Sequence, residues 1–394
     1  MASDFGWVDF AGENQSKMLD VVKLFREKDT RDELGIGTIR DAFSDYFFPG
    51  TSTIQTRARY MLFVPWVYTM LEEKKVRYPK IIDRARKEEI KLVYALLKSD
   101  DTDGIIGSDA KDKLQRLPSA IYWTGMEQWG IRLFPGSRDQ YHRSLRKDYY
   151  RSNERNWDPG LPEPPENIMD YTELRLRRED AEYLVDRISC SQNGTLLYFL
   201  VNEGEGIEAD YFWQLPIVKN LPDTLQNNIQ HARNFTETIY GANLLYNYLL
   251  SIQVENKEWV EKYKEILESW FNLISARRVE LMGWYENLHD FWTSEALTRG
   301  RIPGSTRTFV EQWYEILFNK EKLSNILNSR EAEELIKNRE WKLKRDRARL
   351  WNARAREMWG GASGTTPLDY RWSTVEIIIS DILEGLEKEG GKVA

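Results

Sequence analysis

The sequence predicts a mainly α-helical protein with at most a minor β element. Apolar residues recur at three- and four-residue intervals through much of the 394-residue chain, which is the spacing of amphipathic helices. Four prolines fall within 159–165, a density that neither a helix nor a central strand accommodates. Short turns join the long helical patterns after residue 222, which indicates antiparallel neighbours. We therefore expect an N-terminal helical domain (1–155), a proline-rich linker (156–170) and a C-terminal mainly helical domain (171–394).

Four segments of the first domain have helical patterns. The first lies at 15–28, and the second begins near Thr38 after a glycine-rich stretch. The third is expected to follow a Pro-Gly turn, with Thr51 or Ser52 as its N-cap. The fourth spans about 79–98. These helices suit either a helix-turn-helix type of module or an ordinary helical bundle, and the pattern leaves both alternatives open.

The second domain begins with a short mixed region, 171–215. Its apolar run GTLLYFLVNE (194–203) is the candidate for a buried strand. Two long helical patterns joined by a short turn predict a helical bundle at 222–318. A last helix is expected to open at Ser373, because Ser373 and Glu376 have the spacing of a capping box.

The composition limits the class of protein. The formal net charge is −7, and one cysteine and three scattered histidines argue against a disulfide framework and a Cys- or His-built metal site. No apolar run approaches the roughly 20 residues of a transmembrane helix. The first residues, MASDFGWVDF, lack the basic start of a secretory signal. We therefore expect a cytoplasmic protein without membrane association, metal or cofactor.

The most basic stretch is KNREWKLKRDRARLWNARAREMW, residues 337–359. It holds nine Lys or Arg against three acids, hence a net charge of +6. On one continuous helix, a polar face would comprise Lys342, Arg345, Arg349, Asn352 and Arg356. A second face would comprise Trp341, Ala348, Trp351, Ala355 and Met358, and we expect it to pack on the bundle. The cationic face is predicted to contact nucleic-acid phosphates, which suit the arginine fork. Pairing with the chain's own acids and an acidic protein partner are the alternatives.

A second segment, 138–155, interleaves cations with tyrosines. Its candidate nucleic-acid contacts are Arg138, Arg143 and Arg146. In single-strand binding proteins, bases stack on aromatic rings while cations follow the backbone. The alternative is a tyrosine-rich helix that packs on the rest of the first domain.

The turn PG[ST] occurs three times, in FPGTSTIQTRARY, FPGSRDQYHR and IPGSTRTF. Each turn presents hydroxyl and amide groups at an expected helix start, where the helix dipole favours an anion. The arginines that follow these turns are Arg57 and Arg59, Arg138 and Arg143, and Arg307. These helix starts are candidate phosphate sites, and N-capping without a ligand is the alternative.

No catalytic signature is present. The sequence has no Walker loop, no GxSxG elbow and no protein-kinase motif set. The acids considered for a metal-dependent nuclease are Asp41, Asp45, Glu203, Glu205, Glu208, Asp210, Asp369 and Asp381. Such a site requires acids that converge from separate elements beside a lysine, which a sequence does not show. We assign no catalytic residue.

The chain resembles the bacterial domain-of-unknown-function family 6361 in four long phrases. They are DELGIGTIRDAFSDYFFPGTSTIQTRARYMLFVPW, IYWTGMEQWGIRLFPGSRDQYHRSL, HARNFTETIYGANLLYN and RARLWNARAREMWGGASGTTPLDYRW. The resemblance runs from Gly6 to the last helix. It implies a cytoplasmic bacterial protein encoded in or near phage-defence or DNA-modification islands, among helicases, methylases and phospholipase-D-like nucleases. It transfers no catalytic residue.

These observations predict a non-catalytic subunit of a bacterial anti-phage defence complex, either nucleic-acid-binding or an adaptor. DNA is the favoured nucleic acid, and a helicase or nuclease is the expected protein partner. Two other classes stay open: a metal-dependent nuclease with an unrecognised carboxylate site, and a purely protein-binding scaffold.

Overall fold

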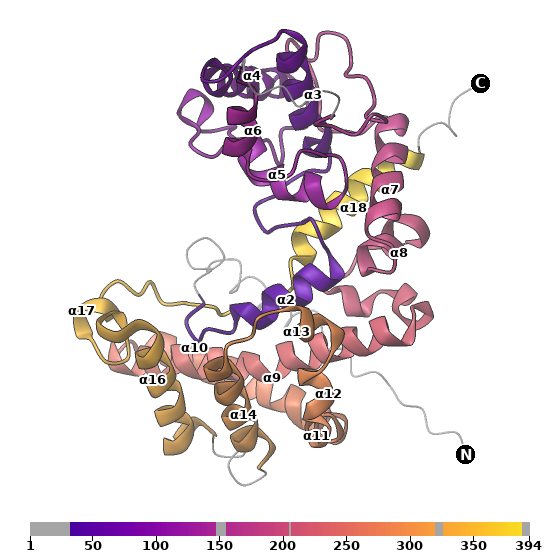
Figure 1. The fold of residues 1–394 in the computed structure, drawn as a ribbon. Coiled ribbons are helices and arrows are strands. Elements are labelled where there is room, and N and C mark those ends of the chain that lie inside the picture. Colours follow the sequence, from indigo (N-terminus) through magenta and orange to yellow (C-terminus); the bar gives the residue numbers. More distant parts are fainter. Residues whose placement is uncertain (1–31, 147–154, 205, 320–325, 388–394) are drawn as a thin grey trace. The chain divides into compact units, whose positions relative to one another are not determined.

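The computed structural model describes residues 32–146, 155–204, 206–319 and 326–387 (Figure 1). The helix expected at 15–28 and the acid Glu205 lie outside these residues. The described part is mainly α-helical, as predicted, and contains no β-strand. Its one β-type pairing is an isolated antiparallel bridge between Arg132 and Trp157. None of its helices combines the length and apolar character that crossing a membrane requires.

The chain divides into two compact units, each built from separate stretches of sequence. Unit 1 comprises Met1–Phe43 and Asn227–Leu368, and unit 2 comprises Ser44–Gln226 and Asp369–Ala394. Two of the boundaries fall inside helices, namely α2 (Gly37–Phe47) and α9 (Asp223–Gln253). The segment 156–170, for which we predict a linker, lies within unit 2.

Unit 2 contains seven further α-helices and three 3-10 turns among its described residues. The helices are α3 (Tyr60–Glu73), α4 (Lys80–Leu96), α5 (Pro118–Gln128), α6 (Arg138–Ser144), α7 (Arg178–Ser191), α8 (Leu196–Glu203) and α18 (Trp372–Glu387). The turns are η1 (Lys111–Lys113), η2 (Phe212–Gln214) and η3 (Pro216–Asn220). α3 is buried along most of its length and packs against α4 and α5. α18 returns from the end of the chain to pack against α7 and α8 (Figure 1).

Three local predictions in unit 2 are wrong. The apolar run 194–203 forms helix α8 instead of a strand, with Thr195 as its N-cap. Periodicity alone does not separate a short buried helix from a buried strand. The third helix begins at Tyr60 instead of near Thr51, because the Tyr122 hydroxyl bonds the chain before it and holds that chain in turns.

The expected capping box of the last helix is also absent. α18 begins at Trp372, so Ser373 lies inside its first turn. The Ser373 hydroxyl donates to Asp369, and Glu376 accepts from the Ala209 amide at 3.4 Å. Asp369 takes the place of the predicted cap because it precedes the helix by one turn and accepts from the Ser373 backbone N–H as well.

Unit 1 contains, besides parts of α2 and α9, seven further α-helices and two 3-10 turns among its described residues. The helices are α10 (Lys257–Ala276), α11 (Arg278–Glu286), α12 (Leu288–Trp292), α13 (Glu295–Arg299), α14 (Gly304–Phe318), α16 (Arg330–Lys344) and α17 (Ala353–Arg356). The turns are η4 (Ile326–Asn328) and η5 (Arg345–Arg347). α14 packs against α16. The region 222–318 is helical as predicted and contains α9 to α14, but the second of its two long helical patterns is divided at Arg277 into α10 and α11.

Candidate nucleic-acid interface

The basic segment 337–359 is not one continuous helix. α16 ends at Lys344, and Arg345 adopts a φ of 52°. The chain then turns through η5 and resumes helical structure only in α17, where Asn352 is the N-cap. The predicted cationic stripe along a single helix face is therefore wrong.

A buried carboxylate accounts for the turn. Glu340 accepts hydrogen bonds from the backbone N–H groups of Arg349 at 2.8 Å and Leu350 at 2.9 Å. It also accepts from the Tyr246 hydroxyl at 2.7 Å. In a continuing helix those two N–H groups would donate to carbonyls four residues earlier. The side chain of Glu340 instead captures them and folds the chain back over the end of α16.

Arg349 and Lys344 form an internal ionic network with Glu33 and Glu340. Arg349 is 6% exposed, and its Nη1 donates to Glu33 at 3.0 Å and to the Ser363 hydroxyl at 2.7 Å. Lys344 pairs with Glu33 and lies 3.7 Å from Glu340. Two carboxylates thus face two cations, which offsets the cost of burying each charge. Arg349, a predicted phosphate contact, faces this network and not solvent.

Five cations of the basic segment form no ion pair with any residue in the described ranges. They are Lys342, Arg345, Arg347, Arg354 and Arg356. The first four are exposed, and the half-buried Arg356 donates through Nε to the Arg349 carbonyl at 3.0 Å. By contrast Lys337 pairs with Glu333. We call residues 341–358 the cationic surface.

Trp341, Trp351 and Met358 are also exposed, against our expectation that their face packs on the bundle, whereas Ala348 of that face is buried. Trp351 is 54% exposed, Trp341 36% and Met358 80%. Of the tryptophans in the described part of the chain, these two have the largest exposed fractions. Their ring centroids lie 5.8 Å apart with planes inclined at 52°. The cationic surface therefore presents aromatic rings among unpaired positive charges.

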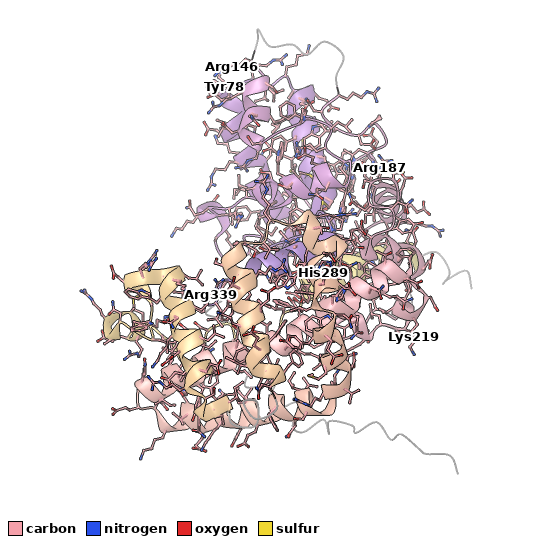
Figure 2. The ribbon with its side chains drawn as sticks, turned by 60° about the horizontal axis from the view of Figure 1, so that its bottom comes forward. Tyr78, Arg146, Arg187, Lys219, His289 and Arg339 are labelled. Carbon is pink, nitrogen blue, oxygen red and sulfur yellow. The ribbon has the colours of Figure 1, made fainter. Side chains whose placement is uncertain are left out.

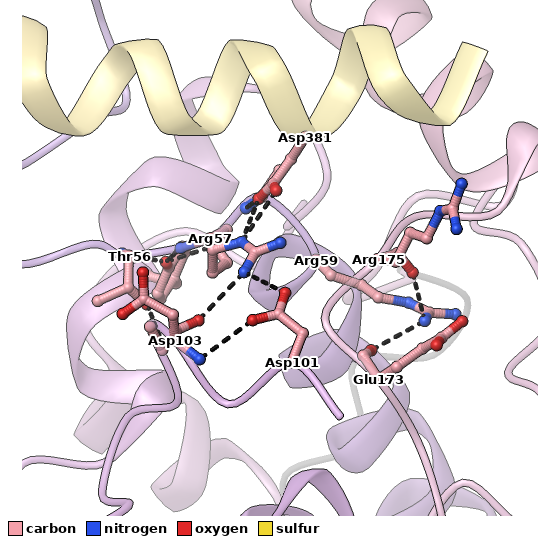
Figure 3. Close-up of polar contacts among 11 residues, drawn as sticks. Thr56, Arg57, Arg59, Asp101, Asp103, Glu173, Arg175 and Asp381 are labelled. Carbon is pink, nitrogen blue, oxygen red and sulfur yellow. Dashed lines mark hydrogen bonds and ion pairs between the residues drawn. The ribbon is translucent and has the colours of Figure 1, made fainter. Parts of the chain in front are cut away.

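Arg57, a candidate from the first PG[ST] turn, forms internal ion pairs (Figure 3). Its Nε donates to Asp381 of α18 at 2.9 Å, and its Nη1 donates to Asp101 at 2.8 Å. Burial raises the pKa of Asp381 to about 6, an effect that the charge of Arg57 opposes. Asp381 also accepts from the Ala58 amide at 2.8 Å. The contacts of Asp381 with Arg57 and Ala58 hold α18 against the segment that precedes α3.

Arg59 is a structural residue of unit 2. It is 2% exposed, and its Nη1 donates to the backbone carbonyls of Glu173 and Arg175, as Figure 3 shows. Its Nη2 donates to Asp180 at 3.2 Å, and its guanidinium lies 5.4 Å from the ring centre of Phe63. Burial lowers the pKa of Arg59, and the charge of Asp180 opposes that shift. Arg59 therefore faces the interior of unit 2.

At the second PG[ST] turn the structure shows N-capping. Ser137 accepts from the Gln140 amide, and the Gln140 side chain accepts from the Ser137 amide, which completes a capping box at the start of α6. Arg138 donates through Nη1 to the Ser119 hydroxyl at 2.6 Å. The amide groups of Ser137 and Gln140 are therefore already bonded to side chains.

The remaining predicted contacts of this region lie on the surface of unit 2. Arg143 pairs with Asp139 at 2.9 Å, one helical turn earlier. Arg146 lies over the ring of Tyr78, 4.7 Å from its centre, and Figure 2 labels the two side by side. At the third turn, in unit 1, Arg307 pairs with Glu311 at 2.8 Å.

The acids considered for a nuclease form no metal-binding group among the described residues. Asp45 pairs with Arg371, Asp369 caps α18 and Asp381 pairs with Arg57. In the described ranges no group of three or more His, Cys, Asp or Glu side chains has the arrangement of a metal site. Glu33 and Glu340 do meet beside a lysine, but every one of their carboxylate oxygens accepts a hydrogen bond or ion pair from the protein.

Sequence reasoning missed Arg347, Arg354 and the exposure of Trp351. One signal in the sequence was Asn352, because asparagine favours N-caps over helix interiors. Dividing the segment at this residue would have removed the single-helix stripe. The sequence contains no comparable signal for the hydrogen bonds that Glu340 accepts from the Arg349 and Leu350 amides.

The fold and this surface together define a mainly helical protein with an exposed cationic and aromatic surface. The chain belongs to a family of unknown function, DUF6361, which matches residues 2–385. The resemblance found in the sequence is thereby confirmed. No curated protein and no solved structure shows a significant match to the chain.

Proposed function

We propose that this protein binds nucleic acid and that the cationic surface contacts the phosphates. The observation that carries this proposal is the set of five cations without an ion-pair partner in the described part of a chain of net charge −7. Four of the five are arginines, whose planar fork donates two parallel hydrogen bonds to a phosphate. Cations already paired within the chain would have to break those pairs first.

The backbone at Arg345 supports the same proposal. This residue has φ 52° and ψ −124°, a conformation that glycine adopts readily and that costs other residues roughly 1–3 kcal/mol. Its side chain is exposed and has no ion pair in the described ranges, so the side chain itself does not offset that cost. Such outliers motivate a functional hypothesis, and a phosphate contact is the one that this side chain suits.

The wider role that we propose is that of a non-catalytic subunit of a bacterial anti-phage defence complex. It follows the genomic setting that the family resemblance implies, with DNA as the nucleic acid and a helicase or nuclease as partner in the cytoplasm. Arg57, Arg59 and Arg349 already form ion pairs within the chain. The exposed cations of the cationic surface are therefore the part of the predicted site that supports this role.

The test compares two triple charge reversals in the full chain. The first is Arg345→Glu, Arg347→Glu and Arg354→Glu. The matched control is Arg178→Glu, Arg299→Glu and Arg330→Glu, which makes the same change in net charge at exposed arginines that pair with acids one turn away. Binding of fluorescent DNA and RNA is measured at about 50 and about 200 mM salt, because phosphate contacts weaken steeply over this range.

We expect the first variant to lose most of its affinity and the slope of log K against log salt to fall by about 2–3, since each phosphate contact contributes about 0.7–0.9. The control variant should bind nearly as the unmodified protein does. Equal loss in both variants would refute a localised contact. Cleavage of the strands with added Mg²⁺ or Mn²⁺ would favour the nuclease alternative instead.

A further inference from the structure

We infer that the nucleic acid bound by the cationic surface is single-stranded and that Trp351 stacks against one of its bases. This inference rests on the proposed function and specifies its ligand. Proteins that bind single strands combine a cationic track for the backbone with aromatic rings for the bases. Trp351 and the five unpaired cations supply both parts within residues 341–358.

The ring of Trp351 is positioned before any ligand binds. Its Nε1 donates to the Lys337 carbonyl at 2.9 Å, and Trp341 packs against it with ring centroids 5.8 Å apart. These two contacts fix the indole although 54% of the residue is exposed. A fixed ring loses little conformational entropy on binding, so stacking costs less than it would for a mobile side chain.

The position of the cations favours a single strand over a duplex. They lie at the end of α16, in η5 and on the four-residue α17, and not along one helix that would enter a major groove. In a duplex each base face is covered by its neighbours, so an indole ring reaches a base face only where the strand is unpaired. An exposed tryptophan contributes to binding of a single strand and has no comparable role against a duplex backbone.

A membrane surface with anionic lipids is the other class of ligand with related chemistry. A tryptophan at a membrane interface places the apolar part of its ring in the lipid and its N–H at the polar boundary. Here the N–H of Trp351 is bound to a backbone carbonyl of the same unit, so the ring offers its face and not its donor. The geometry therefore favours stacking, and vesicles form one arm of the test.

The experiment uses the full-length protein and four probes. They are a fluorescent single strand of mixed sequence, its duplex, an abasic strand of the same length and vesicles of phosphatidylserine and phosphatidylcholine. The abasic strand keeps the phosphates and removes the bases, so it tests stacking without any change to the protein. The variants are Trp351→Ala and Trp351→Phe, with Tyr171→Ala as a control at an aromatic residue outside the cationic surface that is 55% exposed.

We expect the unmodified protein to bind the single strand at least about tenfold more tightly than the duplex or the abasic strand, as loss of a stacked base predicts. Trp351→Ala should weaken single-strand binding by roughly 10-fold or more and leave the abasic strand and the salt slope unchanged. Trp351→Phe should keep most of the affinity, and Tyr171→Ala should keep all of it.

Three results would overturn the inference. Equal binding of normal and abasic strands by the unmodified protein would show that bases are not contacted, while salt-dependent binding would leave the proposed function standing. Binding of vesicles without binding of strands would replace the nucleic acid by a membrane surface. Absence of salt-dependent binding to any strand would refute the proposed function together with the inference.

Discussion

Arginines of this chain have two different roles that their sequence neighbours do not distinguish. Arg59 in TRARY and Arg354 in NARAR have similar local sequences, yet the first is buried and the second is exposed. The acceptors of Arg59 lie 114 to 121 residues further along the chain. Local sequence therefore identifies these residues as cations but does not tell which of them already has a partner.

Replacement of Arg59 by alanine should cost about 3–5 kcal/mol of unfolding free energy, because it leaves two buried carbonyls without their donor and removes one of the two arginines that pair with the buried Asp180 carboxylate. Urea denaturation measures this loss. Arg178→Ala, which removes an exposed ion pair, should cost less than about 1 kcal/mol. A loss below about 1 kcal/mol for Arg59→Ala would contradict the structural role.

Glu89 is a buried acid that sequence reasoning did not single out. It is fully buried and accepts from the Ser119 amide and hydroxyl, each at 2.8 Å. Burial raises the pKa of its carboxyl from 4.5 to about 7, and the two hydrogen bonds from Ser119 oppose the shift. Between these two values the folded chain holds a proton that the unfolded chain has released.

The free energy of unfolding should therefore fall as the pH rises from about 5 to about 7, by at most on the order of 3 kcal/mol from this group. Glu89→Gln should make the profile flatter over this interval, as melting temperatures at several pH values would show. Asp381, whose pKa burial raises to about 6, acts in the same direction and should account for part of the slope that remains. An unchanged slope in Glu89→Gln would refute the assignment.

At the scale of elements, long periodic patterns were predicted well and their ends were not. The helices near Thr38 and at 79–98 are present as α2 and α4, since an amphipathic stripe of several turns packs only as a helix. The start of α3 depends on the Tyr122 hydroxyl, the end of α16 on its own Glu340, and the start of α18 on Asp369. At the candidate site, Lys342 and Arg345 are exposed as predicted, whereas Arg349 is buried because it pairs with Glu33, which lies 316 residues away in the sequence.

The end of α16 gives a prediction for Arg345. Replacement by glycine relieves a backbone conformation that costs roughly 1–3 kcal/mol but increases the freedom of the unfolded chain by up to about 1 kcal/mol. Arg345→Gly should therefore stabilise the protein by about 1 kcal/mol while weakening nucleic-acid binding. Arg347→Gly, at a residue without a positive φ, should destabilise it slightly. Chemical denaturation compares the two, and a less stable Arg345→Gly variant would contradict the argument.

At the scale of the whole molecule, the two compact units are not consecutive halves of the chain. The prediction of a linker at 156–170 depends on the prolines of that segment. Local composition does not indicate which distant segments pack together in the two units. Unit 2 takes its last helix from the C-terminal end of the sequence. The family match over 2–385 includes both units.

This division predicts the effect of ending the chain at Leu368. The shortened chain lacks α18, which packs on α7 and α8 and supplies Asp381 to Arg57. We expect unit 2 to lose its cooperative unfolding, with a fall in helical circular dichroism larger than the 16 residues of α18 alone would give. A chain that ends at Glu387 serves as the control. Full retention of cooperative melting by the shorter chain would refute the dependence of unit 2 on α18.

The distribution of charge has a consequence for the speed of association. The segment 337–359 carries +6 in a chain of −7, so all other residues together carry −13. A polyanion that approaches from solution is repelled by the average charge of the molecule and attracted by one region of it. Long-range fields of this kind orient a partner during diffusion and change the rate of encounter more than the lifetime of the complex. A polyanion that approaches in the wrong orientation would then diffuse away before it forms a close contact.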